Sequence, residues 1–186
     1  MNVQDLLADV ATAPVVKRAI TNHDVLNEAY DYGSAFSRGM RIDLNGLTVL
    51  LISGTASIDD AGRTVHVGDL RAQVRRTFDN ITKLLASEGA TWHDIVRTTC
   101  YLRDIERDYG AFNEERTAFY REQGLDPLPA STGIQAILCR PELLIEIEAI
   151  AECTMGAWAI SLRRSASNSM TIIPDYTGKF AGRRAD

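Results

Sequence analysis

Two apolar runs between Arg41 and Gly54 flank an Asn45-Gly46 dipeptide. Asn-Gly is the pair that most readily adopts the two positive φ angles of a type I′ turn. The segment therefore predicts a β-hairpin and fixes one antiparallel pair of strands in the fold. The polar segment from Ser57 to Arg63 is consistent with the turn of a second, irregular hairpin.

Helical periodicity follows in two places. Between Gly68-Asp69 and Gly89, apolar residues recur at three- and four-residue spacing, which predicts an amphipathic helix of about five turns. A second helix is predicted from about Tyr109 to Glu122, with Gly124 as its stop signal. One side of this second helix carries Tyr109, Phe112, Arg116, Phe119 and Tyr120.

Strand patterns occupy the segments between and after the helices. A strand is predicted from Ile95 to Leu102, with Val96, Thr98, Cys100 and Leu102 on one face, and two more apolar runs are Thr132–Cys139 and Leu143–Ala151. This order of strands and helices is typical of an α+β fold. Two helices packed on one face of a single mixed β-sheet would bury both helical stripes.

The last predicted strand carries two carboxylates. Alternation places Leu143, Ile145 and Ile147 on one face and Leu144, Glu146, Glu148 and Ile150 on the other. From the residues alone, two interpretations remain open: a solvent-facing strand surface, or a polar cleft between subunits.

Composition excludes several classes of function. The 25 acidic and 20 basic residues give a net charge of −5, which argues against nucleic acid as the main partner. Cys100, Cys139 and Cys153 include no Cys-x-x-Cys pair, and the three histidines lack metal-ligand spacing, so neither a disulfide framework nor a metal site is expected. We expect no export signal and no membrane-spanning segment, and a cytoplasmic location.

The chain is predicted to have three parts. Residues 1–32 read as an N-terminal arm, with a short helix possible around Val3 to Ala11. Residues 33–153 form the domain, and residues 154–186 form a basic C-terminal extension with five basic and two acidic side chains.

Several motifs in the same order resemble the RidA/YjgF family. No single motif is diagnostic, but their order and spacing match across about residues 33–152. The motifs are Ser53-Gly54-Thr55-Ala56, Gly68-Asp69 with Gln73 and Asn80, Gly89 before Asp94-Ile95-Val96, Tyr101-Leu102, Asn113, Pro129-Ala130, and Ile145-Glu-Ile-Glu-Ala-Ile-Ala151.

This resemblance implies a fold, an assembly and a reaction. The fold would be chorismate-mutase-like, in a barrel-like homotrimer with the helices outside and three ligand clefts at the subunit interfaces. Deaminating members hydrolyse 2-imino acids and their enamine tautomers to 2-keto acids and ammonia without a cofactor. Glu146 matches the glutamate that positions water in those members.

One position departs from the deaminase pattern. The arginine that holds the substrate carboxylate directly after Pro-Ala is replaced by Ser131. A neutral hydroxyl in place of a bidentate guanidinium costs about 2 to 3 kcal/mol of carboxylate affinity. Either another cation reaches the cleft, with Arg140 or Arg38 as candidates, or the substrate differs.

A second resemblance is to chorismatases, which hydrolyse the enol-ether side chain of chorismate. It rests on Cys139-Arg-Pro-Glu-Leu-Leu-Ile-Glu146, on Gly54-Thr-Ala-Ser57 and on Thr64-Val-His-Val-Gly-Asp69. It implies that Glu146 donates a proton and that Cys139 takes part. Chorismatases carry an additional domain before this one, so the likeness concerns site chemistry more than substrate.

These observations predict a cofactor-free enzyme that hydrolyses or deaminates an imine or enamine of a small metabolite. Glu146 is its acid and base, and Cys139 is a second catalytic candidate. The candidate ligand contacts are Ser131, Thr132, Phe36, Asn113, Arg140 and Glu148. The alternatives are a chorismatase-like enol-ether hydrolase and a non-catalytic trimeric protein that binds a ligand or regulates.

Overall fold

A computed structural model describes residues 15–21 and 35–154 of the chain. The predicted helix around Val3 to Ala11 and the C-terminal extension from Met155 onward lie outside these residues. The described elements are β1 Val16–Ile20, β2 Gly39–Leu44, β3 Leu47–Ala56, α2 Leu70–Ser87, the 3-10 helix η2 Trp92–Asp94, β4 Ile95–Leu102, α3 Ile105–Glu122, β5 Ala130–Gln135 and β6 Ile145–Thr154.

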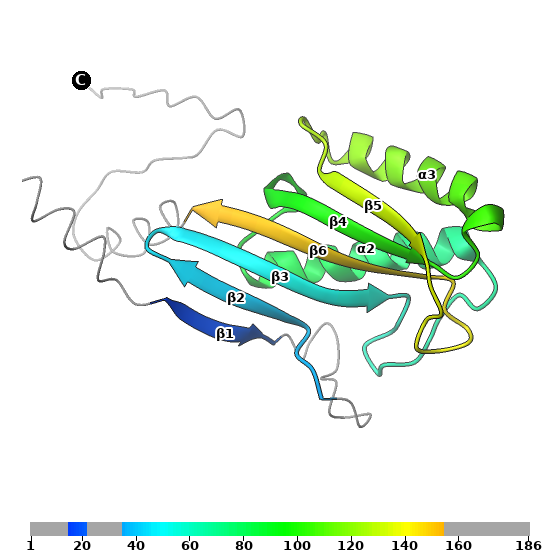
Figure 1. The fold of residues 1–186 in the computed structure, drawn as a ribbon, viewed down its shortest axis with the longest axis horizontal. Helices are drawn as coiled ribbons and strands as arrows, with labels where there is room; N and C mark the ends of the chain where they lie inside the picture. Colours follow the sequence, from blue (N-terminus) through cyan, green and yellow to red (C-terminus); the bar gives the residue numbers. More distant parts are fainter. Residues whose placement is uncertain (1–14, 22–34, 155–186) are drawn as a thin grey trace, which may run out of the picture. The chain divides into compact units, whose positions relative to one another are not determined.

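The strands form one mixed sheet in the order β1-β2-β3-β6-β4-β5. The β4–β5 pair is parallel, and the other neighbouring strands are antiparallel. Strand β6, the last strand of the described residues, runs between β3 and β4 in the interior of the sheet (Figure 1). This position surrounds the predicted acidic strand with two neighbouring strands rather than leaving it at an edge.

The predicted hairpin is present as β2 and β3. Asn45 has φ of 48° and Gly46 has φ of 97°, the positive values that a type I′ turn needs. Strand β1 was not indicated by the sequence, although it lies within the residues predicted as an arm. It pairs antiparallel with β2 and extends the sheet by one strand.

Both predicted helices are confirmed, and each begins at an aspartate cap. Asp69 accepts a hydrogen bond from the Ala72 amide at 3.0 Å, as expected for an N-cap. Helix α3 begins at Ile105 rather than near Tyr109, because Asp104 caps it by accepting from the Arg107 amide at 3.1 Å. Most residues in the first turn of α3 are charged, so the apolar periodicity in the sequence begins only at Tyr109.

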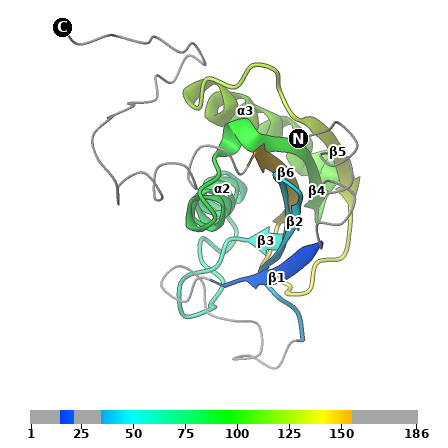
Figure 2. The same cartoon turned by 90° about the vertical axis from the view of Figure 1, so that its left-hand side faces the viewer.

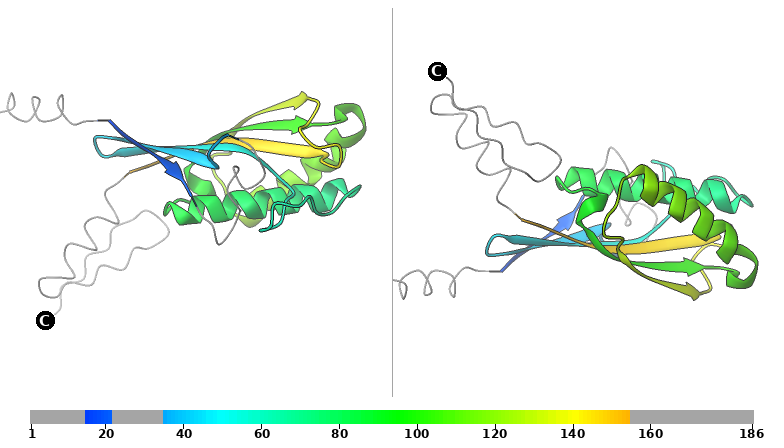
Figure 3. Two further views of the ribbon diagram at one scale, coloured as in Figure 1. Left: turned by 90° about the horizontal axis from the view of Figure 1, so that it is seen from below. Right: turned by 90° about the horizontal axis from the view of Figure 1, so that it is seen from above.

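The two helices pack on the same face of the sheet, as predicted (Figures 2 and 3). Aromatic rings join them: the centroids of Phe78 on α2 and Phe119 on α3 are 4.6 Å apart, and Trp92 of η2 packs against both rings at 5.3 and 4.9 Å. The sheet contributes its alternate apolar residues to this core. The core therefore lies between the helices and one sheet face, which leaves the other face without a described helix.

Two details of the predicted strands are wrong. Val96 does not share the buried face of Thr98, because a register shift between Ile95 and Arg97 turns it outward and leaves it 40% exposed. The apolar run after Gln135 is not strand: β5 ends there, and the chain enters a loop that leads to β6.

Candidate active site

Strand β6 presents its two carboxylates on the face that the helices leave open. Ile145 and Ile147 are fully buried in the core, whereas Glu146 and Glu148 alternate with them and are half-buried. The shared face predicted for Glu146 and Glu148 is confirmed. Because β6 is an interior strand, each carboxylate is flanked by residues of β3 and β4.

A bulge in β3 makes room for the Glu146 side chain. The β3–β6 register shifts between Ile52 and Thr55, and Gly54 lies within this irregular stretch. A Cβ atom built on Gly54 would come within 2.9 Å of Glu146 Cδ and closer still to Oε1. The carboxyl group therefore occupies the space that any other residue at position 54 would fill.

Tyr101 borders the carboxylates from the other side. It lies opposite Glu146 in the β4–β6 register. Burial, then a hydrogen bond with Glu148, and then the negative charges of Glu148 and Glu146 raise the pKa of the Tyr101 hydroxyl. The tyrosine therefore stays protonated and is a hydrogen-bond donor beside the two carboxylates.

Glu146 is the carboxyl group whose ionisation this environment disfavours. Burial raises its pKa above the ordinary value of 4.5, and the negative charge of Glu148 raises it further. A carboxyl with a raised pKa keeps its proton nearer to neutral pH, which suits a group that both donates and accepts protons.

The raised pKa predicts a dependence of stability on pH. Well below pH 4.5 the Glu146 carboxyl is neutral in both states, and as pH rises the unfolded state ionises first, so this group increasingly favours unfolding. Glu146→Gln should therefore increase the free energy of unfolding at neutral pH but not at low pH. The gain is about 1.4 kcal/mol for each unit by which the pKa is raised. Urea unfolding across this pH range measures it, and a pH-independent difference from wild type would contradict it.

The segment that contains Phe36 runs beside the bulge. The Ser53 amide donates to Arg38 O at 3.1 Å, and Ser53 Oγ donates to Ser37 O at 2.7 Å. Arg38 is buried, and its Cζ lies 5.5 Å from the centroid of the Phe36 ring, which is 43% exposed. The sequence-predicted Phe36 is thus on the segment next to Gly54, although contact with a ligand stays a prediction.

Cys139 and Arg140 lie in the loop between β5 and β6. The Cys139 side chain is exposed. Arg140 Nη1 donates to Gly62 O at 2.7 Å and so ties this loop to the one after β3. Arg103 holds the same loop by donating to Leu143 O at 2.6 Å and to Arg140 O at 2.5 Å. Among the described residues, no hydrogen bond or ion pair joins Cys139 to Glu146.

Ser131 and Thr132 occupy opposite faces of β5. Thr98 Oγ1 donates to Ser131 Oγ at 3.0 Å, and Thr98 is fully buried on the helix side of β4. Arg97 Nη2 donates to Thr132 Oγ1 at 3.1 Å on the face that carries Glu146. Within one chain, Ser131 and Glu146 therefore lie on opposite faces of the sheet.

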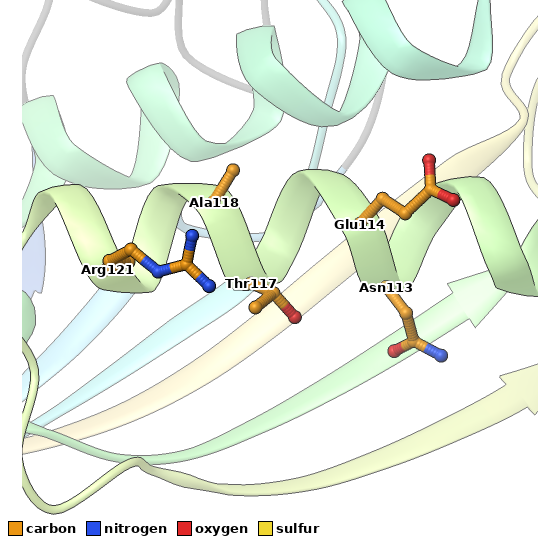
Figure 4. Close-up of a pocket in the computed structure, with 5 residues that line it drawn as sticks. All are labelled: Asn113, Glu114, Thr117, Ala118 and Arg121. Carbon is orange, nitrogen blue, oxygen red and sulfur yellow. The ribbon is translucent and has the colours of Figure 1, made fainter.

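Asn113 on α3 supports an arginine that the sequence did not single out. Arg116 Nη2 donates to Asn113 Oδ1 at 2.5 Å, and Arg116 Nη1 donates to Ser131 Oγ at 2.9 Å. The sequence contains one signal that could have indicated Arg116: it is the charged residue on the apolar side of the predicted helix. Asn113 also lines a hollow of about 380 Å³ along α3 that includes Thr117 and Arg121 (Figure 4).

The described ranges contain no group of three His, Cys, Asp or Glu side chains placed to hold a metal ion. In those same ranges, neither α2 nor α3 is long and apolar enough to cross a membrane.

Comparison of the sequence with known proteins finds a matching family and named relatives. The family described as Endoribonuclease L-PSP matches residues 28–153. The chain is 32% identical over 103 residues to a protein of Acinetobacter baylyi named 3-aminoacrylate deaminase RutC, covering 55% of this chain and 78% of the relative.

Solved structures share the fold. The YjgF gene product from E. coli has a TM-score of 0.59 and 25% identity, with 72% of this chain and 97% of that chain covered. RidA from an Antarctic Psychrobacter has a TM-score of 0.60 and 20% identity, with 73% and 99% covered. The family match covers most of the chain, and these structures have the same arrangement of sheet and helices. This chain belongs to the RidA/YjgF family.

Proposed function

We propose that this protein is a cofactor-free enzyme that hydrolyses an enamine or imine of a small metabolite, with Glu146 as its acid and base. The observation that carries the proposal is the Glu146 carboxyl: it is half-buried, lies over Gly54 on the open sheet face, and has a raised pKa. The similarity to a relative named as a deaminase supports this reaction class.

The chemistry needs one group that moves a proton in both directions. Protonated Glu146 donates to the carbon end of the enamine C=C bond, which gives an iminium ion. The carboxylate then accepts a proton from water as the water oxygen bonds to the iminium carbon. Glu146 next protonates the nitrogen of the carbinolamine and takes the hydroxyl proton, so the C–N bond breaks. One water is consumed, and one ammonia and one carbonyl compound form.

A homotrimer is part of the proposal, with the open sheet face at the contact between copies. Leu51 on β3 is 39% exposed and Ile134 on β5 is 43% exposed, both on this face. Large apolar side chains left exposed on a sheet face that no described helix covers are consistent with a contact surface. Size-exclusion chromatography with light scattering tests this part: a mass of three chains supports it, and a monomer contradicts it.

Incubation with reactive metabolites tests the reaction. An aminoacrylate is the first substrate to offer, together with 2-imino acids generated in the assay, with ammonia and the carbonyl product measured against the uncatalysed rate. Chorismate forms a separate arm, followed by pyruvate release. Faster ammonia release supports the proposal. Pyruvate release from chorismate alone, or ligand binding without any turnover, would replace it with one of the two alternatives.

A further inference from the structure

A second hollow lies where the C-terminal half of α3 approaches the start of β5. Its volume is about 320 Å³. Polar groups line it from both elements, and apolar residues of the connecting loop close it. These residues include Arg116, Arg121 and Ser131 on the polar side and Leu125, Leu128 and Pro129 on the apolar side.

The two arginines of this hollow differ from those between the helices. Arg71 and Arg75 of α2 form ion pairs with Glu115 of α3. In the part of the chain that the structure describes, neither Arg116 nor Arg121 forms an ion pair with a carboxylate. The hollow therefore has two guanidinium groups without a matching negative charge, which favours an anionic ligand.

Neutral contacts hold Arg116 in one orientation. Its guanidinium donates to Ser131 Oγ at 2.9 Å and to Asn113 Oδ1 at 2.5 Å, and its Cζ lies 4.9 Å from the Phe112 ring centroid. A guanidinium has five N–H donors, so these two hydrogen bonds leave donors for a ligand. Fixing the side chain before binding lowers the entropy cost of capturing a carboxylate.

We propose that this hollow binds the carboxylate of the substrate, with Arg116 as the principal ligand, Arg121 as a second positive charge and Ser131 as the residue that positions Arg116. The inference rests on the proposed function. The hollow thus has a positive charge beside position 131 although that residue is a serine: the Ser131 hydroxyl accepts a hydrogen bond from the Arg116 guanidinium of α3. Because Ser131 and Glu146 lie on opposite faces within one chain, Glu146 of a second copy completes the site.

Binding of pyruvate, a small 2-oxo carboxylate, tests the anion site without turnover. Arg116→Gln should weaken binding by about 10- to 100-fold, the loss of one charge-assisted interaction. Ser131→Ala should weaken it by a smaller factor. The control Arg63→Gln removes an exposed arginine of a distant loop that pairs with Asp59, and it should change nothing. Unchanged affinity in Arg116→Gln, or equally tight binding of uncharged methyl pyruvate by wild type, would overturn the inference.

The same assay separates this inference from the proposed function. Glu146→Gln should bind pyruvate at least as tightly as wild type. If the wild-type protein turns over no enamine, but Arg116→Gln binds pyruvate more weakly than wild type, then the proposed reaction fails while the carboxylate site is supported.

Mixed assemblies test the contribution of a second copy. Arg116→Gln and Glu146→Gln chains are co-expressed in equal amounts with different tags. Random assembly places an intact Arg116 opposite an intact Glu146 at about one quarter of the interfaces. Activity at low substrate should therefore return to about one quarter of the wild-type value. Activity no higher than the average of the two separate variants would show that the copies do not share the site.

Discussion

Replacing Glu146 with Gln is expected to lower kcat for enamine hydrolysis by about 10²- to 10⁴-fold, the usual contribution of a general acid or base. Gln has nearly the same shape and keeps a hydrogen-bonding group, so it fits over Gly54 without a clash. It carries no exchangeable carboxyl proton, so neither protonation of the enamine carbon nor deprotonation of water can proceed through it. Initial rates of ammonia release, corrected for the uncatalysed reaction, measure the loss.

The control for this variant lies on the same strand. Glu152 shares the alternation of Glu146 and Glu148 but is exposed near the end of β6. Glu152→Gln makes the same chemical change and should leave kcat within about twofold of wild type. Equal rates for Glu146→Gln and wild type would remove Glu146 from the mechanism, even if the protein proves to be an enzyme.

The second large effect is expected at Gly54, which has no chemical role of its own. Its φ is outside the left-handed region, so the backbone accepts an alanine there. The added methyl group would occupy the position of the Glu146 carboxyl, and β6 cannot retreat because it is paired on both sides. The carboxyl must therefore rotate away, and a displacement of about 1 Å costs about 10²-fold in kcat/KM.

Two comparisons show whether the Gly54 effect passes through Glu146. Gly110→Ala is the matched control, because a Cβ there meets nothing within 4 Å. It should retain full activity. The double variant Gly54→Ala with Glu146→Gln should be no slower than Glu146→Gln alone, since both changes act on one group. Additive losses in the double variant would mean that Gly54 matters for another reason.

The parts of the fold that local sequence determines were predictable. The Asn45-Gly46 turn and the periodic stripe of α2 need no information from distant residues. Strand β1 was not predictable, because its five residues include Lys17 and Arg18 and give no clear alternation. It is held by contacts far away in sequence: Arg18 donates to Glu88 at the end of α2, at 2.9 and 2.5 Å.

The same division applies to the site. Alternation along β6 was enough to place Glu146 and Glu148 on one face. The role of Gly54 depends on a bulge that shifts the β3–β6 register, which no local pattern indicated. No local pattern pairs Arg116 with Ser131, because the two residues come from different elements, α3 and β5. The face of Ser131 follows from the β4–β5 register, and that register is set by pairing across the sheet.

The pH dependence of kcat/KM for an enamine substrate tests most directly whether Glu146 is the proton donor. The side chains that face it are Glu148 of its own strand and Tyr101 of β4. We expect kcat/KM to fall as pH rises through a pKa above 4.5, because the protonated carboxyl is required. Glu148→Gln should move this fall to lower pH, because it removes the negative charge that adds to burial in raising the pKa of Glu146, whereas Glu152→Gln should not move it. A fall that stays at the same pH in Glu148→Gln, or a rate that does not fall at all, would contradict the assignment of Glu146 as the acid.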